Sequence, residues 1–502
     1  MKRSALLLMV LIAIFLSASL GITASKDLKP GQGAPLSSET EACIDCHKSF
    51  HGGLVEDWLT SRHARTTPEA ALQKPELERR ISSTAIPVKL QKVAVGCYEC
   101  HALNEKAHKD NFEHFGYNIN VVVTPNDCKT CHNTEAEQYA GSKKASALLN
   151  LQKNPVYHTL VETIVGTKAL RDGKIVRSGV SEDVKNGTCY GCHGTEVSVK
   201  GMKKLSTEMG DIEVPNLTNW PNQGVGRINP DGSTGACTSC HPRHGFSLKV
   251  ARKPYTCGEC HLEPDSPAYN VYNESKHGNI YASVYQDWNF DNVPWTVGKD
   301  FRAPTCAACH NSLIVNADKE VIASRSHDFG ARLWVRIFGL IYSHPQPKGG
   351  KTYEIKNKDG LPLPTAFTGE LASAFLIDQA EQTKRQKAMK GVCQSCHSTS
   401  WTDGYFAKFQ KMVDEADAMV KPATQLLLTA WGRGLADKTN PFDEPIEQRW
   451  VRQWLFYANS VRYAAAMQGP DYASFKNGFW ELTNNLAEME QFIRLMPAKK
   501  KK

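Results

Sequence analysis

The chain has 502 residues, which is enough for about two or three domains, and a formal net charge of +8 at pH 7. The excess of basic residues includes Lys2 and Arg3 at the extreme N-terminus, so it is a poor indication of nucleic-acid binding. No apolar run after the N-terminus approaches the length of a membrane span, which argues against a protein with an internal transmembrane helix.

The first residues have the pattern of a signal peptide. Lys2 and Arg3 precede the apolar run SALLLMVLIAIFLSASLG, and small residues suited to cleavage lie between Gly21 and Ser25. We therefore predict a signal peptide over residues 1–25 and export to the periplasm or an equivalent compartment as a soluble protein. Retention of this segment as a membrane anchor is the alternative.

Sixteen cysteines follow, and their spacing excludes an ordinary disulfide framework. They form eight C-x-x-C pairs, and each pair is followed at once by histidine. The pairs are Cys43/Cys46, Cys97/Cys100, Cys128/Cys131, Cys189/Cys192, Cys237/Cys240, Cys257/Cys260, Cys306/Cys309 and Cys393/Cys396. The histidines are His47, His101, His132, His193, His241, His261, His310 and His397, and we number the motifs one to eight in this order.

C-x-x-C-H is the attachment motif of c-type haem, in which two thioethers hold the porphyrin and the histidine ligates the iron. Zinc sites and thiol redox sites also use paired cysteines, but they do not need histidine after every second one. The sequence therefore predicts eight covalently bound c-type haems (iron). Their propionates are expected to make the mature protein net acidic, which weakens the case for nucleic-acid binding further.

Nine histidines lie outside the motifs, and low-spin haems need a second axial ligand. Seven of the nine are expected to be distal iron ligands: His63, His114, His158, His244, His277, His327 and His344. His51 and His108 look more exposed and are left over. This assignment gives seven bis-histidine haems and one open iron, although the number of histidines also permits eight closed haems.

Residues 26–401 carry all eight motifs at irregular intervals of about 20 to 90 residues, without a repeat. We expect short helices and loops packed around the haems, with Asp-Gly turn signals predicting hairpins in LRDGKIV and YEIKNKDGLPL. A Pro/Gly/Asn-rich loop is expected over residues 214–235. The predicted fold class is mainly α, a multihaem cytochrome c followed by long C-terminal helices.

Residues 402–502 have no cysteine and show apolar residues at helical spacing. Three helices are predicted, from about Phe406 to Trp431 with a kink at Pro422, from Ile446 to Ala465, and from Phe475 to Ile493. Their many aromatic residues need a partner surface, so we expect them to cover the haem region and to build an oligomer.

Several stretches resemble the octahaem hydroxylamine oxidoreductases: CYGCHGT at motif four, the block CTSCHPRHGFS to CGECHLEPDSPAYNVYNESKHG over Cys237–Gly278, and the long C-terminal helices. Octahaem nitrite and tetrathionate reductases are less similar, because they hold the active haem through C-x-x-C-K. The resemblance implies that motif four carries the catalytic haem, with its distal side open to nitrogen substrates and seven bis-histidine haems as electron carriers. It also implies a homotrimer in which a neighbouring subunit's tyrosine is cross-linked to that haem.

His193, Asp265 and Tyr463 are the candidate catalytic residues. Asp265 occupies a stretch where oxidative relatives are expected to have an Asp-His pair, but here Ser266 follows it, and a simple turn residue beside Pro264 is the alternative. The cross-linking tyrosine is expected one residue before Met467, where this chain has Ala466. Tyr463 lies about one helical turn earlier and stays a candidate, whereas Tyr472 follows a Gly-Pro break and is expected to pack between helices.

The sequence therefore favours an oxidoreductase that interconverts hydroxylamine, nitric oxide and nitrite. Because Ala466 occupies the position expected for the cross-linking tyrosine, reduction of nitrite to nitric oxide is slightly favoured over oxidation of hydroxylamine or hydrazine. A catalytically silent electron-transfer protein and an electron-storage subunit of a larger complex are the alternatives. Expected partners are a small nitrogen substrate, a redox partner such as a small cytochrome c, and either identical copies in a homotrimer or a related chain in a hetero-oligomer.

Overall fold

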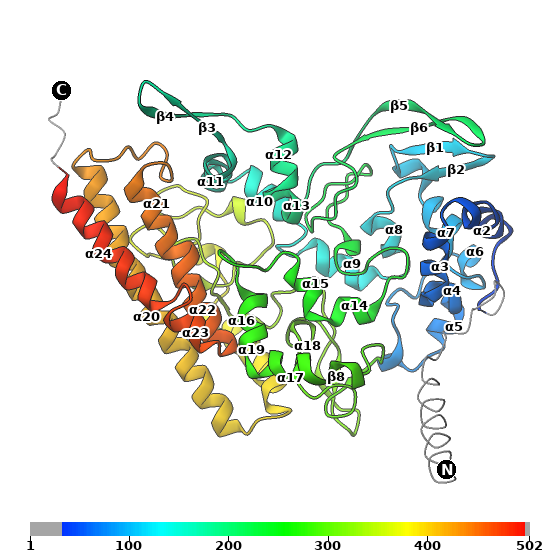
Figure 1. Ribbon diagram of the computed structural model, residues 1–502. Coiled ribbons are helices and arrows are strands. Elements are labelled where there is room, and N and C mark those ends of the chain that lie inside the picture. Colours follow the sequence, from blue (N-terminus) through cyan, green and yellow to red (C-terminus); the bar gives the residue numbers. More distant parts are fainter. Residues whose placement is uncertain (1–32, 497–502) are drawn as a thin grey trace, which may run out of the picture.

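The structure is a computed structural model, and it describes residues 33–496. The predicted signal peptide over residues 1–25 lies outside these residues. Figure 1 shows the N-terminal motif helices at one end of the molecule and the long C-terminal helices at the other, with two hairpins standing on one side. Within residues 33–496, no helix combines the length and the apolar character needed to cross a membrane.

Short helices separated by loops make up the motif-bearing region, as predicted. Several begin at a side-chain cap; for example, Ser37 accepts a hydrogen bond from the amide of Thr40, and Asn154 accepts one from the amide of Val156. The α-helices are α2 (Ser38–Phe50), α3 (Gly52–Thr60), α4 (Arg62–Arg65), α5 (Pro68–Leu72), α6 (Val88–Gln91), α7 (Cys97–His101), α8 (Pro125–Lys129), α9 (Asn133–Ala140), α10 (Ala147–Gln152), α11 (Pro155–Val165), α12 (Glu182–Gly187), α13 (Cys189–His193), α14 (Leu248–Arg252), α15 (Pro254–Gly258), α16 (Ala268–Glu274), α17 (Lys276–Val284), α18 (Cys306–His310) and α19 (Gln379–Gln394). The 3-10 turns are η1 (Glu76–Glu78), η2 (Glu105–Ala107), η3 (Cys237–Ser239), η4 (Tyr285–Asp287), η5 (Thr352–Glu354) and η6 (Ser373–Phe375).

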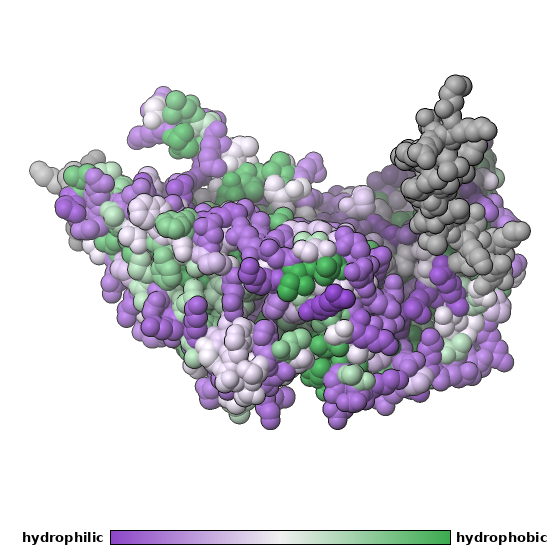
Figure 2. Space-filling model, turned by 60° about the horizontal axis from the view of Figure 1, so that its bottom comes forward, coloured by the Kyte–Doolittle hydropathy of each residue, from purple (hydrophilic) through white to green (hydrophobic). Residues whose placement is uncertain are grey.

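The predicted hairpin around LRDGKIV is present as β3 (Thr167–Arg171) and β4 (Lys174–Ser178), which pair antiparallel. Asp172 and Gly173 both have positive φ, 50° and 73°, as a tight two-residue hairpin turn requires. Leu170 and Ile175 are 71% and 64% exposed. Figure 2 shows the hairpin as an arm that stands away from the body and carries hydrophobic surface.

A second long hairpin, β5 (Ser198–Thr207) with β6 (Gly210–Thr218), follows motif four and was not predicted. Its second strand takes the first five residues of the stretch predicted as a loop over 214–235, and the remainder of that stretch is irregular. The other strands are short: β1 (Asn111–His114), β2 (Tyr117–Asn120), β7 (Trp295–Thr296), β8 (Ile314–Val315), β9 (Val321–Ala323), β10 (Val335–Arg336) and β11 (His344–Pro345).

The hairpin predicted in YEIKNKDGLPL is wrong. Asp359 and Gly360 do form a turn, closed by a hydrogen bond from the amide of Asn357 to the carbonyl of Leu361. Beyond that bond the flanking residues form no paired strands, and the backbone just before them is held elsewhere: Asn150 Oδ1 accepts from the amide of Thr352. The Asp-Gly signal therefore predicted the turn correctly but not the pairing of the residues on its two sides.

The cysteine-free C-terminal residues form helices. α20 (Thr399–Gly432) continues past Pro422, and a second helical run comprises α21 (Pro445–Val451), the π-helical turn η7 (Arg452–Tyr457) and α22 (Ala458–Met467). After α23 (Pro470–Ser474) comes α24 (Phe479–Leu495). The predicted start of the third helix at Phe475 is wrong, because Phe475 is the C-cap of α23 and α24 begins after Gly478.

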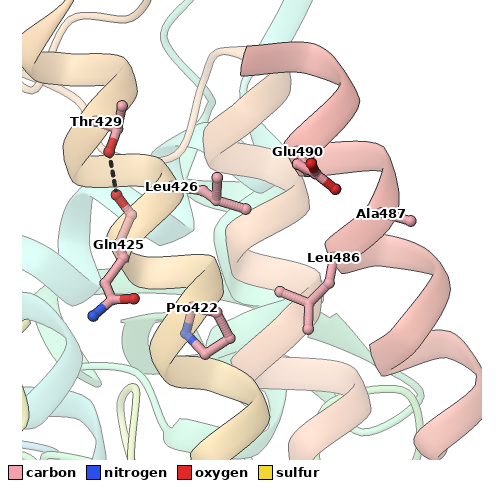
Figure 3. A pocket seen from close by; sticks show the side chains of 7 residues that line it. All are labelled: Pro422, Gln425, Leu426, Thr429, Leu486, Ala487 and Glu490. Carbon is pink, nitrogen blue, oxygen red and sulfur yellow. Dashed lines mark hydrogen bonds between the residues drawn. The ribbon is translucent and has the colours of Figure 1, made fainter. Parts of the chain in front are cut away.

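These helices share the largest hydrophobic core with an irregular segment of the motif region. Trp450 and Trp454 are each 1% exposed and pack with Leu427 of α20 and with Ile341 and Leu363. A shallow groove remains between α20 and α24 on the outer side of these helices (Figure 3). It is lined by Pro422, Gln425, Leu426, Thr429, Leu486, Ala487 and Glu490.

Candidate haem sites and catalytic centre

Three motif histidines face a second histidine across a gap that fits one iron. The ring centroids are 6.1 Å apart for His47 and His114, 6.3 Å for His132 and His63, and 6.2 Å for His397 and His277. Two imidazoles that ligate one metal from opposite sides at about 2 Å have their ring centroids roughly 6 Å apart. The geometry at motifs one, three and eight therefore fits bis-histidine ligation.

Two further pairs of histidines are neighbours. The charge of His101 of motif two lowers the pKa of His244. The charge of His327 likewise lowers the pKa of His241 of motif five. The Nδ1 atom of His101 lies 2.7 Å from the carbonyl of Asn120, an interaction that leaves Nε2 available to a metal.

Other ring nitrogens are buried and unpaired within the described residues. His63 Nδ1, His327 Nδ1 and His344 Nε2 have no hydrogen-bond partner there. Nδ1 of His344 lies 2.7 Å from the carbonyl of Pro345, so its tautomer leaves Nε2 free to bind metal. Buried polar atoms are normally satisfied, so these nitrogens support the predicted role of their side chains as ligands.

The three remaining histidines outside the motifs each have a polar side chain at a ring nitrogen. His51 Nδ1 lies 3.1 Å from His47 Nδ1, where it can orient that ring. His108 was expected to be exposed, but it is 5% exposed, with Asp110 and Asp127 at its two nitrogens. His158 Nε2 faces the carboxylate of Glu162 at 3.8 Å, and its predicted role as an iron ligand stays a prediction.

Covalent haem also suits the state of the thiols and the buried charges. All sixteen cysteines are free of disulfides. Arg227, Arg252 and Arg332 are at most 5% exposed and bond to carbonyl or amide oxygens rather than to carboxylates within the described residues. Buried cations are costly unless anions lie near them, and haem propionates would add to the negative charge that Asp291 and Asp300 supply near Arg252. The residues present therefore fit c-type haem.

Two of the predicted haem-attachment cysteines are exposed, Cys260 of motif six and Cys396 of motif eight, whereas the other fourteen are half-buried. Cys396 lies in the turn between α19 and α20, where its amide donates to the carbonyl of Cys393 at 3.1 Å. Its Sγ lies 3.8 Å from Ser395 Oγ. Attachment of haem through these two cysteines stays a prediction, as it does for each of the other fourteen.

Contacts between thiols of different motifs show how the motifs follow one another in space. The thiols that shift one another's pKa most strongly are Cys43 with Cys97, Cys128 with Cys237, Cys192 with Cys260, and Cys257 with Cys306. Electrostatic neighbours are Cys100 with Cys131, Cys240 with Cys257, and Cys309 with Cys393. The motifs thus form one chain in the order one, two, three, five, six, seven, eight, and motif four branches from motif six.

Charged groups of both signs lie near motif four: Lys144 and Arg336 act on His193, whereas Asp265 and Glu259 act on Cys192. Burial lowers the pKa of His193, and the positive charges of Lys144 and Arg336 lower it further. Lys144 also acts on His261 and His310, so it lies where motifs four, six and seven meet. Burial lowers the pKa of the adjacent Lys143 to about 7. The branch point therefore gathers cationic side chains.

The structure brings Asp265 and Tyr463 to this branch point. Asp265 acts electrostatically on Cys189, Cys192 and Tyr463, and burial raises its pKa. It lies in a turn, as the simpler interpretation of the sequence expected. Burial also raises the pKa of Tyr463, which keeps its hydroxyl protonated.

Sequence reasoning missed the role of Ser266. Its Oγ lies 3.1 Å from Nδ1 of His261 and 3.3 Å from the hydroxyl of Tyr463, which is 197 residues further along the chain. The sequence contained no signal for this contact, because the serine was judged only against the Asp-His pair expected there.

The other residues of the tyrosine-bearing segment are structural. Tyr472 is 1% exposed and packs with Val271 and Ala464, as expected. The carbonyl of Ala466 accepts a hydrogen bond from the hydroxyl of Tyr405.

Comparison with known proteins defines the class. Residues 230–324 match the family described as "Seven times multi-haem cytochrome CxxCH", and residues 42–118 and 127–213 match "Cytochrome c554 and c-prime". Together with the motif geometry, these matches identify a multihaem cytochrome c with covalently bound c-type haems.

A solved structure titled "Hypothetical multiheme protein" is 41% identical, with a TM-score of 0.87 over 95% of this chain and 99% of that one. The chain belongs to the same multihaem cytochrome family as that protein. The "reducing HAO-like protein complex Kustc0457/Kustc0458" of Kuenenia stuttgartiensis shares the fold, at 18% identity and a TM-score of 0.58 over 91% of this chain and 85% of that one.

Among curated proteins, a "Probable nitrite reductase-hydroxylamine oxidoreductase fusion protein" of Kuenenia stuttgartiensis is 25% identical over 354 residues. The match covers 61% of this chain and 38% of the fusion protein, so the chain corresponds to less than two fifths of that relative.

Proposed function

We propose that the protein is an octahaem oxidoreductase of small nitrogen compounds that reduces nitrite to nitric oxide at motif four. The observation that carries this proposal is the environment of His193, whose charged neighbours are Lys144 and Arg336. The name of the curated Kuenenia relative, which mentions a nitrite reductase and a hydroxylamine oxidoreductase, supports the same substrate class.

Bound haem supplies iron that exchanges single electrons and, where a coordination position is open, binds small nitrogen ligands. The side chains of this protein contribute charge and protons. Lys144 and Arg336 attract an anion to the branch point, which favours nitrite over neutral hydroxylamine. Asp265, whose pKa is raised by burial, is suited to deliver a proton there, and the chain of motifs provides the route for electrons.

Steady-state kinetics and electron paramagnetic resonance (EPR) test this proposal. The reduced holoprotein is expected to consume nitrite and release nitric oxide, and Lys144→Gln is expected to raise KM for nitrite more than it lowers kcat. The matched control is Lys153→Gln. Lys153 caps the end of α10, and its ammonium group lies over the ring of Tyr353 in η5 rather than at motif four. Rapid hydroxylamine oxidation without nitrite reduction, or a tyrosine peptide bonded to haem in mass spectrometry, would contradict the reductive direction.

A second candidate is an electron-transfer subunit within an assembly of related chains. It is favoured by the likeness to a protein whose title names a complex of two chains. EPR separates the two functions: an entirely low-spin spectrum that cyanide and nitric oxide leave unchanged would favour the subunit, whereas a high-spin component altered by either would favour the enzyme.

A further inference from the structure

The sixth motif differs from the second in what its histidine bonds to. Nδ1 of His101 lies against a backbone carbonyl at 2.7 Å, whereas Nδ1 of His261 lies against the hydroxyl of Ser266 at 3.1 Å. A carbonyl can only accept, but a hydroxyl accepts and donates, so its strength as an acceptor depends on what it bonds to next.

The next group is the hydroxyl of Tyr463, 3.3 Å from Ser266 Oγ. If Nε2 of His261 held a haem iron, Nδ1 would carry the ring's proton and would donate a hydrogen bond to Ser266 Oγ. The single O–H of Ser266 is then available to donate to Tyr463. Such a donation polarises the serine oxygen and strengthens its bond to His261.

The surrounding contacts hold this arrangement in place. Ser266 is 8% exposed, and its amide bonds to the carbonyl of Leu262 at 3.0 Å. Asn459, one helical turn before Tyr463 on α22, donates to the carbonyl of Asp265 at 3.2 Å and accepts from Arg462 at 3.0 Å. The turn that carries Ser266 is therefore fastened to the helix that carries Tyr463.

We propose that Ser266 and Tyr463 form a hydrogen-bond relay to Nδ1 of His261 that sets the reduction potential of the haem at motif six. A hydrogen-bond acceptor on Nδ1 makes the imidazole a stronger ligand, which stabilises oxidised iron. Ser266 and Tyr463 are thus positioning residues for an electron-carrying haem. Motif six adjoins motifs four, five and seven. The relay therefore controls the haem through which electrons reach motif four. The inference depends on haem at motif six and not on nitrogen chemistry.

The test is a potentiometric titration of the holoprotein without substrate, followed by EPR. Ser266→Ala is expected to raise the midpoint potential of one haem by the equivalent of about a tenfold change in its reduction equilibrium, which is about 59 mV for one electron. Ser266→Thr keeps the hydroxyl and is expected to retain the original potential. Tyr463→Phe is expected to give a smaller shift in the same direction.

Tyr472→Phe is the matched control, because this buried tyrosine bonds to Glu263 of the same turn without joining the relay. Unchanged potentials in Ser266→Ala, or equal shifts in Tyr463→Phe and Tyr472→Phe, would overturn the proposal. If Ser266→Ala does not mature, Tyr463→Phe decides alone, and unchanged potentials in that variant overturn the relay. Since no substrate is present, absence of nitrite turnover would leave these outcomes unaffected.

Discussion

His108 is a buried histidine with a carboxylate at each ring nitrogen. Nδ1 lies 3.1 Å from Asp110 and Nε2 lies 3.2 Å from Asp127, and both nitrogens must carry a proton to donate to both partners. Each carboxylate also accepts a backbone amide, Asp110 from Val122 and Asp127 from Thr124. The imidazolium therefore joins the hairpin β1–β2 to the helix of motif three.

Removing this imidazole leaves two buried carboxylates without their cation. His108→Ala is expected to lower the free energy of unfolding by about 3–5 kcal/mol, the usual consequence of breaking a buried ion pair. Chemical denaturation of the fully haem-loaded protein measures it. His51→Ala, at an exposed histidine, is the control, and an equal loss in both variants would contradict the assigned role.

The same group predicts a dependence on pH. Burial alone would lower the pKa of His108, but hydrogen bonds to Asp110 and Asp127 outweigh burial and raise it to about 10. Because the unfolded value is about 6.5, the contribution is fully present below about pH 6.5 and is lost as pH rises through about 10. The stability difference between wild type and His108→Ala should therefore shrink in alkaline solution. A difference that grows with pH would contradict a protonated His108.

Among the elements, the C-terminal helices show how one residue fastens several segments. Trp450 of α21 is 1% exposed, and its indole nitrogen donates to Thr424 Oγ1 of α20 at 3.0 Å. Its ring also meets Phe367, which comes from the irregular part of the motif region, with centroids 5.5 Å apart. The helices therefore pack against the motif region through a shared core.

Trp450→Ala is expected to cost about 3–5 kcal/mol of unfolding free energy, because it leaves a large cavity in this core. Trp480 of α24 is 56% exposed, and Trp480→Ala should change stability by less than about 0.5 kcal/mol. Thermal unfolding of both variants provides the comparison. Similar losses would show that the core does not depend on Trp450.

On the scale of the whole molecule, motif six is central and motif one is terminal. Replacing Cys43 and Cys46 by serine is expected to give a folded protein with seven haems in place of eight. The same change at Cys257 and Cys260 is expected to prevent folding, because motifs four, five and seven all adjoin motif six. Haem content by the pyridine haemochrome assay and protease resistance report both outcomes. Equal tolerance of the two changes would contradict the branched order.

The sequence predicted those features that depend on local chemistry. The C-x-x-C-H motifs, the Asp172-Gly173 hairpin and the helical spacing around Trp431 were all visible in short stretches. Contacts between residues far apart in the sequence could not be predicted in this way. The approach of Ser266 to Tyr463 and the packing of Trp450 on Phe367 depend on the complete fold, and so does the loss of the hairpin expected around Gly360.

The paired thiols of neighbouring motifs carry a consequence for biosynthesis. In the folded polypeptide, Cys43 and Cys97 lie near enough to shift one another's pKa, and so do Cys192 and Cys260. Thiols this close oxidise readily to disulfides in an oxidising compartment. A chain that collapsed before its cysteines were alkylated by porphyrin vinyl groups would risk being trapped with cross-links between motifs. The architecture therefore favours a maturation order in which haem ligation acts on the extended polypeptide and compaction comes afterwards.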